Sequence, residues 1–105
     1  MTNLSHEVNT KILGTGIYLP EKIMTNFDLE KIVDTNDQWI YERTGIKSRR
    51  ISSTEGGEFP TDMAEKASWK ALQAAGLEPN DIDMIIFASV TPDQKLPNSA
   101  SLLQQ

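Results

Sequence analysis

Two side chains in the middle of the chain, Trp39 and Arg43, have the types and spacing that could bind a ligand. On a helix, residues four apart are neighbours on one face. A flat indole ring beside a planar guanidinium can hold a purine ring between two faces. The pair therefore indicates a nucleotide-binding surface, with plain surface packing as the more frequent explanation where nothing else points to a ligand.

Local signals place this pair on a short helix. Thr35 and Gln38 fit a capping box, in which a threonine and a glutamine three residues later satisfy each other's backbone N–H groups. Gly45 is the residue type that commonly ends a helix in the left-handed conformation. We expect a helix between this cap and this glycine, and capping alone is a sufficient explanation for Thr35.

A second short helix is expected just before the first one, and a strand or an extended arm just after it. Thr25 or Asn26 can cap the earlier helix. The charged residues of the later segment, 46–51, suit the edge of a sheet. The earlier helix has apolar residues at helical spacing, which are Leu29, Ile32 and Val33.

Composition and charge exclude several kinds of site. The 105 residues include no cysteine and one histidine, His6. A structural zinc site is thereby excluded, as is a cysteine or histidine nucleophile within this chain. The net charge of −5 argues against a nucleic-acid partner, which needs a basic face. Lys47, Arg49 and Arg50 are expected to form a solvated face, with phosphate contact as the less frequent alternative.

No segment predicts a signal peptide or a membrane span. Residues 1–10 are polar, and we expect them to form a flexible leader. The longest apolar run, residues 84–88, is far too short to cross a bilayer. The absence of cysteine is compatible with a reducing compartment. We expect a cytoplasmic protein with no membrane partner.

Two apolar segments, residues 11–19 and 84–90, predict strands. Gly14 and Gly16 in the first segment lack the third glycine of a dinucleotide fingerprint, whose position is Leu19. Such glycines more often allow a neighbouring element to approach closely. The second segment is apolar without alternation, which is typical of a strand buried on both faces of a parallel sheet.

The longest predicted helix begins at a cap on Thr61 or Asp62 and ends at Gly76. One face carries small residues at helical spacing, so it can pack closely on another backbone. Trp69 lies off this face and is expected to cover another neighbour. The small-residue face comprises Ala64, Ala67, Ser68, Ala71, Leu72 and Ala75.

The order of elements predicts an α/β fold whose sheet is incomplete. A last helix is expected from Asn98 or Ser99, and no further strand follows it to complete the unit. We infer that the chain is part of something longer. As a free globule it would expose about 5,900 Å², so a real core is expected to be possible.

Several segments resemble β-ketoacyl-acyl-carrier-protein synthase III. The resemblance covers about residues 11–105, and its most specific block is Asp37-Gln38-Trp39-Ile40 followed by Arg43-Thr44-Gly45-Ile46. The other similar segments are the stretch 11–20, Thr25-Asn26, Asp28-Leu29-Glu30, Val33-Asp34-Thr35, the stretch 71–76, Asp81-Ile82-Asp83 and Thr91-Pro92-Asp93.

The resemblance implies a thiolase-like fold, with residues 11–105 as the N-terminal part of its first half. It implies an acyltransferase that condenses an acyl-CoA primer with malonyl-acyl carrier protein, which starts fatty-acid synthesis. The enzymes of this family are homodimers, and the CoA thioester is a substrate rather than a bound cofactor. The family's catalytic cysteine, histidine and asparagine would all lie beyond Gln105, so we expect the 105-residue chain alone to be inactive.

Family roles carry over to four positions. Trp39 and Arg43 resemble the pair that sandwiches the adenine of CoA, and Thr35 resembles a threonine near the same nucleotide. Leu96 stands where a residue of one subunit reaches the acyl pocket of the other. A bulky aromatic is common there in acetyl-specific members, so leucine leaves the acyl-chain preference open.

Two alternatives remain open at this stage. Related thiolase-fold enzymes perform acyl condensations in secondary metabolism, and the first 105 residues do not distinguish them from a synthase of fatty-acid synthesis. The chain could also be a non-catalytic nucleotide-binding or assembly piece. In that case the apolar segment 84–90 would need a partner to cover it.

Overall fold

The computed structural model describes residues 9–105. The flexible leader expected over residues 1–10 lies outside the described residues except for Asn9 and Thr10, which have no regular secondary structure. Within residues 9–105, no helix is long and apolar enough to cross a membrane.

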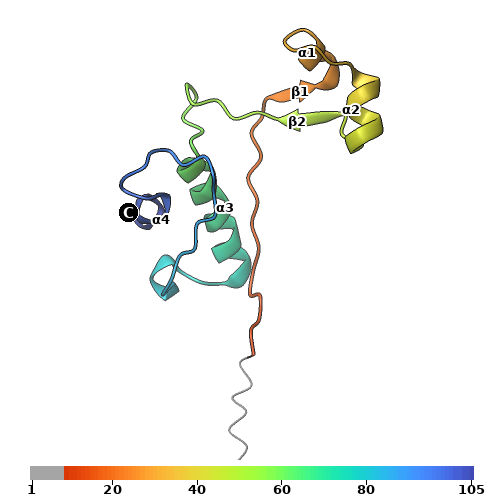
Figure 1. Cartoon of the computed structure of the whole chain (residues 1–105). Helices are drawn as coiled ribbons and strands as arrows, with labels where there is room; N and C mark the ends of the chain where they lie inside the picture. The colour runs from red at the N-terminus through yellow and green to blue at the C-terminus, as the bar shows by residue number, and fades with distance from the viewer. Residues whose placement is uncertain (1–8) are drawn as a thin grey trace, which may run out of the picture.

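The first part of the molecule is a small unit of two strands and two helices (Figure 1). It contains β1 (Ile23–Thr25), α1 (Asn26–Glu30), α2 (Asp37–Thr44) and β2 (Ser48–Arg50). The two strands pair antiparallel, with Met24 opposite Arg49. The segment 46–51, predicted as a strand or an arm, is therefore a short strand in this two-stranded ribbon.

The second part of the molecule is built around its longest helix, α3 (Pro60–Ala75). A short 3-10 helix, η1 (Pro79–Asp81), follows it, and α4 (Ser99–Gln104) packs against it near the end of the chain. Residues 9–22 run as extended chain beside α3 before they enter β1 (Figure 1).

Local capping explains where the helices begin and end. Thr25 caps α1 in a capping box with Asp28, as one of the two predicted caps. Gly76 ends α3 with φ of 68°, in the left-handed region that glycine tolerates best. Asn98 caps α4 by accepting the Ser101 N–H at 2.9 Å. These three helix boundaries, the starts of α1 and α4 and the end of α3, agree with the sequence analysis.

The start of α3 differs from the prediction of a cap at Thr61 or Asp62. Phe59 is the N-cap residue and Pro60 occupies the first helical position, where its missing N–H has no cost. Asp62 lies in the first turn instead, and its carboxylate accepts the Phe59 N–H at 3.0 Å. Thr61 is bound by the Asp93 carboxylate through both its N–H and its hydroxyl.

The extended segment 11–19 packs on the small-residue face of α3, as its glycines predicted. A Cβ atom added at Gly14 would lie 2.5 Å from the Ala71 carbonyl oxygen. A Cβ atom added at Gly16 would collide with the Ala67 carbonyl oxygen. Only glycine allows the two backbones to come this close. The small-residue face of α3 is therefore a packing surface.

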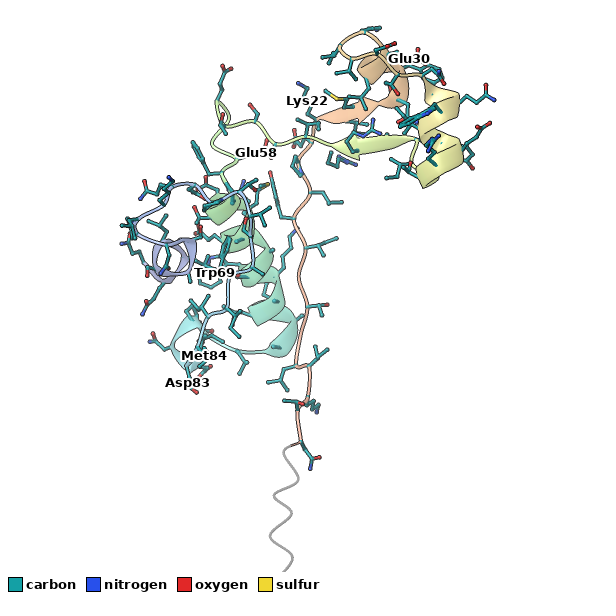
Figure 2. All side chains as sticks on the ribbon, viewed as in Figure 1. Lys22, Glu30, Glu58, Trp69, Asp83 and Met84 are labelled. Carbon is teal, nitrogen blue, oxygen red and sulfur yellow. The ribbon has the colours of Figure 1, made fainter. Side chains whose placement is uncertain are left out.

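The segments 11–19 and 84–90 are extended but are not strands, and this part of the prediction was wrong. Neither makes a backbone hydrogen bond to a neighbouring segment among the described residues. An apolar sequence favours extended backbone, but a strand also needs a second strand to pair with. No described segment supplies one. Met84, labelled in Figure 2, is 77% exposed.

The apolar residues of the described chain are not enclosed in a core. The solvent-accessible surface is 9061 Å², against the roughly 5,900 Å² expected for a closed globule of this mass. Ile40 is the one buried hydrophobic residue among residues 9–105. The core that the chain length makes possible is therefore not formed by the described residues alone. Large apolar side chains on the first part and on both extended segments remain exposed.

Candidate nucleotide-binding site

Trp39 and Arg43 stack on the exposed face of α2, as their spacing predicted. The guanidinium carbon of Arg43 lies 4.7 Å from the centre of the Trp39 ring system. Trp39 is 52% exposed, and Arg43 is also exposed. Ile40, the next residue along the helix, is buried. The helix thus places one side chain in the interior and presents a flat cation–π pair to solvent.

The cap of α2 differs from the prediction. Asn36, not Thr35, is the N-cap residue, and its side chain accepts the Trp39 N–H at 2.8 Å. The Gln38 side chain donates instead to Glu42 at 2.8 Å. The threonine–glutamine capping box was therefore wrong, because asparagine one residue later is an equally strong cap. Gly45 ends the helix with φ of 70°, as predicted.

Thr35 lies beside Trp39 although it does not cap the helix. Asp34, Thr35, Asn36 and Trp39 line a shallow depression of about 170 Å³ at the start of α2. The Thr35 hydroxyl is buried and has no hydrogen-bond partner among the described residues. An unsatisfied buried hydroxyl is unfavourable unless a partner completes it. The depression therefore lies beside a flat aromatic face, while the Thr35 hydroxyl is covered.

The basic residues after α2 were expected to form a solvated face, which holds for the exposed Lys47 and Arg50 but not for the half-buried Arg49. Arg49 donates to the Met24 carbonyl at 3.3 Å and to the Asn26 side-chain oxygen at 2.7 Å. Arg50 donates to the Pro20 carbonyl at 3.0 Å. Lys47 is exposed, with its ammonium 5.4 Å from the centre of the Tyr41 ring.

Asn26 connects α2 to the ribbon, and the sequence analysis missed this role. It is completely buried. Its amide nitrogen donates to Asp37 Oδ1 at 2.9 Å and to the Ile46 carbonyl at 2.7 Å. The only signal in the sequence was that Asn26 belongs to a segment of the resemblance, which does not reveal partners 11 and 20 residues away.

Leu96 directly precedes α4, in the second part of the molecule, whereas the Trp39 pair is on α2 in the first part (Figure 1 shows α2 and α4). It is 84% exposed on the loop before α4. Asp93, on the same loop, accepts the Thr61 N–H at 3.0 Å and also the Thr61 hydroxyl proton. These bonds attach the loop to the first turn of α3. The structure therefore presents Leu96 to the outside from an anchored loop.

Metal ligands do not gather anywhere in the described part of the chain. No group of three histidine, aspartate or glutamate side chains within residues 9–105 could hold a metal ion.

Comparison with known proteins gives relatives but no matching family model. The chain is 54% identical over 101 residues to β-ketoacyl-acyl-carrier-protein synthase III of Caldanaerobacter subterraneus, covering 96% of this chain and 30% of that protein. It is 53% identical over 97 residues to the synthase III of Aquifex aeolicus, covering 92% of this chain and 30% of that protein.

Solved structures agree with these relatives. The crystal structure of 3-oxoacyl-acyl-carrier-protein synthase III from Aquifex aeolicus matches 91% of this chain and 30% of its own, with a TM-score of 0.85 and 53% identity. The priming β-ketosynthase of the R1128 polyketide pathway matches 90% of this chain and 28% of its own, with a TM-score of 0.83 and 32% identity.

The similar sequences and structures define the class of protein to which this chain belongs. The chain has a thiolase-like α/β fold and contains the N-terminal part of its first half, with the sheet incomplete. Within that class, the chain resembles the N-terminal portion of β-ketoacyl-acyl-carrier-protein synthase III, which confirms the resemblance found in the sequence. The chain spans about 30% of the length of the curated relatives it matches.

Proposed function

We propose that the protein containing this chain is a β-ketoacyl-acyl-carrier-protein synthase III, which condenses an acyl-CoA primer with malonyl-acyl carrier protein. The chain would supply the nucleotide end of the CoA site. The observation that carries this proposal is the exposed stack of Trp39 and Arg43, 4.7 Å apart, within the most specific block of the resemblance. The names of the most similar relatives support the same activity.

In this proposal, α2 binds CoA through the adenine. The indole of Trp39 and the guanidinium of Arg43 hold the purine ring by stacking and cation–π attraction. Thr35, which lines the same depression as Trp39, would lie near the same nucleotide. These three residues bind and orient the thioester but take no part in bond making.

The bond-making residues lie outside this chain in the proposed enzyme. A cysteine thiolate would take the acyl group from CoA, which is nucleophilic catalysis. A histidine and an asparagine would stabilise the charge that develops when the malonyl group loses carbon dioxide. The 105-residue chain has no cysteine, so we expect it to show no condensing activity alone.

Leu96 is proposed to contact the acyl pocket of a second subunit in a homodimer. It is exposed on a loop that Asp93 anchors to α3, so it can reach a neighbouring subunit from a defined position. Leucine is smaller than the aromatic side chain that the resemblance associates with acetyl-specific enzymes. The acyl-chain preference is therefore best measured directly with a series of acyl-CoA primers.

Substitution of the stacked pair tests the CoA site. We expect Trp39→Ala and Arg43→Ala in the full-length enzyme each to weaken use of the acyl-CoA by about 1–2 kcal/mol, or about 5- to 30-fold in KM. Initial rates at varied acyl-CoA and saturating malonyl-acyl carrier protein give this KM. The matched control is Gln38→Ala, on the same helix, whose side chain donates a hydrogen bond to Glu42. An unchanged KM for acyl-CoA in both test variants would refute the proposed binding of adenine by Trp39 and Arg43.

An earlier measurement decides whether that experiment is possible. The intact mass of the protein as its own gene expresses it, with a thiol titration on the same sample, shows whether catalytic groups accompany this chain. A mass several times 11.7 kDa with a reactive thiol supports the condensing enzyme. A mass of 11.7 kDa without a thiol refutes it and favours a non-catalytic nucleotide-binding or assembly piece.

A second candidate is a condensing enzyme of secondary metabolism. It is favoured by the likeness to the priming β-ketosynthase of the R1128 polyketide pathway, at 32% identity and a TM-score of 0.83. Both candidates use the same CoA site, so the Trp39 and Arg43 variants do not separate them. The two candidates are distinguished by measuring condensation rates with carrier proteins from fatty-acid systems and from polyketide systems side by side.

A further inference from the structure

We propose that Asn26 is a positioning residue for the nucleotide site, because its side chain fixes both ends of α2 against the β1–β2 ribbon. This inference rests on the proposed function of Trp39 and Arg43 in CoA binding. Asn26 itself would not touch the ligand. It would set the direction in which α2 presents the stacked pair.

Burial and hydrogen bonding show that Asn26 is at the centre of the first part of the molecule. It has no exposed surface, in a chain whose only buried residues among those described are Pro20, Asn26, Ile40 and Ser99. Its amide nitrogen donates to Asp37 Oδ1 at 2.9 Å and to the Ile46 carbonyl at 2.7 Å. Asp37 is the first residue of α2, and Ile46 directly follows the glycine that ends it. One amide group therefore bridges the two ends of the helix.

The other polar groups of Asn26 join the helix to the ribbon. Its side-chain oxygen accepts from Arg49 Nη2 at 2.7 Å, and its backbone N–H donates to the Lys47 carbonyl at 3.0 Å. Arg49 lies on β2 opposite Met24 of β1 and also donates to the Met24 carbonyl. The orientation of α2 is thus coupled to the register of the ribbon through one fully satisfied side chain.

Burial separates positioning from binding around α2. Asn26 of α1 and Ile40 of α2 are buried, whereas Trp39 and Arg43 of α2 are exposed. Without the amide, α2 keeps its Asn36 cap and its Gly45 end, so the helix itself persists. It would lose its fixed orientation, and loss of orientation weakens binding without removing a ligand contact.

Asn26→Asp is the substitution that tests the two amide hydrogen bonds most specifically. Asn26→Asp keeps the shape and the acceptor for Arg49 but removes both N–H donors, and it places a carboxylate against the Asp37 carboxylate. We expect the KM for acyl-CoA to rise about tenfold, since an unsatisfied buried polar group weakens the arrangement that it supports. We expect kcat to change less than about twofold, because α2 supplies binding and not chemistry.

A reciprocal exchange distinguishes positioning from a loss of folding. Asn26→Asp combined with Asp37→Asn restores a donor and an acceptor between the two positions, with their roles reversed. We expect this double variant to recover at least half of the lost affinity, on a logarithmic scale. Failure of the double variant to improve on Asn26→Asp would overturn the inference. So would a fall in kcat that matches the rise in KM, which indicates general disorder.

A fluorescence titration provides a second readout of the same site. In a Trp69→Phe background, Trp39 is the remaining tryptophan of this segment, and acrylamide quenching of its emission reports its exposure. CoA should protect Trp39 in the parent and in a Gln38→Ala control, and should protect it less in Asn26→Asp at the same CoA concentration. If other tryptophans lie beyond this chain, 5-fluorotryptophan labelling with assignment by Trp39→Phe identifies the Trp39 signal.

The pattern of results separates this inference from the proposed function. If Trp39→Ala and Arg43→Ala raise the KM and Asn26→Asp does not, the CoA site stands and the role of Asn26 is refuted. If none of the three variants raises the KM, the proposed CoA site itself is refuted, and the role of Asn26 is refuted with it. If Asn26→Asp does not fold, Asp37→Ala removes one of the two anchors at the half-buried start of α2. An unchanged KM in that variant would overturn the inference.

Discussion

Asp28 shows how a single side chain stabilises the first turn of α1. Its carboxylate accepts the Thr25 N–H at 2.9 Å and the Thr25 hydroxyl at 2.8 Å. These hydrogen bonds, the backbone one foremost, favour the ionised form and hold the pKa of Asp28 below its usual range. The Lys31 ammonium, at 3.9 Å, acts in the same direction and is a smaller cause.

The lowered pKa of Asp28 predicts a dependence of stability on pH. Because the pKa is lower in the folded state, the stabilisation is fully present above the unfolded pKa, near 4. It is lost as the pH falls through the folded pKa. We expect Asp28→Asn to be less stable than the parent at pH 6, with the difference shrinking below pH 4. Urea unfolding midpoints at several pH values measure this. A difference that stays constant with pH would contradict it.

Residue-scale prediction succeeded where both partners were close in sequence. Trp39 and Arg43 were paired from their spacing, and the structure has them stacked. The cap of α2 was assigned one residue too early, because Thr35 and Asn36 are both good caps and the chain uses the second. The role of Asn26 in connecting α2 to the ribbon was missed because its side-chain partners are 11, 20 and 23 residues away.

At the scale of elements, the close packing of segment 11–19 on α3 depends on the absence of side chains at two positions. Gly14 and Gly16 face the carbonyl oxygens of Ala71 and Ala67 on the helix. Backbone atoms in the middle of a helix cannot move aside without breaking helical hydrogen bonds. The contact is therefore more sensitive to an added methyl group than a contact between side chains would be.

We expect Gly16→Ala to destabilise the full-length protein by about 1–3 kcal/mol, the usual range for overpacking. The added Cβ would collide with the Ala67 carbonyl oxygen and lie 2.5 Å from the Ala71 nitrogen. Gly56→Ala is the matched control, since its Cβ would meet no atom closer than 3.5 Å. Urea unfolding of both variants gives the comparison. Equal stability of the two would show that segment 11–19 does not pack this way.

Element prediction depended on whether the stabilising contacts are local. Helix α3 was found from its helical periodicity and its Gly76 end, and α4 from its Asn98 cap, all of which lie within or next to the segment itself. Residues 11–19 and 84–90 were predicted as strands from apolar content, but pairing needs a second segment and the described chain has none in place. The thiolase-like fold itself was predicted from sequence motifs shared with a family, not from these periodicities.

For the whole molecule, the exposed apolar residues and the comparison with relatives both indicate that the apolar segments of this chain lack a covering partner. The radius of gyration is 19.4 Å, against about 13 Å for a compact domain of this length. Relatives that match nearly all of this chain are about three times its length, since it covers 30% of them. Ile86 and Val90, 86% and 97% exposed, lie on an extended segment whose backbone also lacks a partner. A segment with both properties favours association with another strand.

We therefore expect the isolated 105-residue chain to associate in solution. Light scattering should give masses above 11.7 kDa, and a hydrophobic dye such as ANS should bind without ligand. Ile86→Lys should reduce association, because lysine on an open strand edge opposes further pairing. Gln94→Lys adds the same charge at an exposed loop position and is the control. A monomer of 11.7 kDa with a sharp thermal transition would contradict this prediction, since it would mean that the apolar segments need no covering partner.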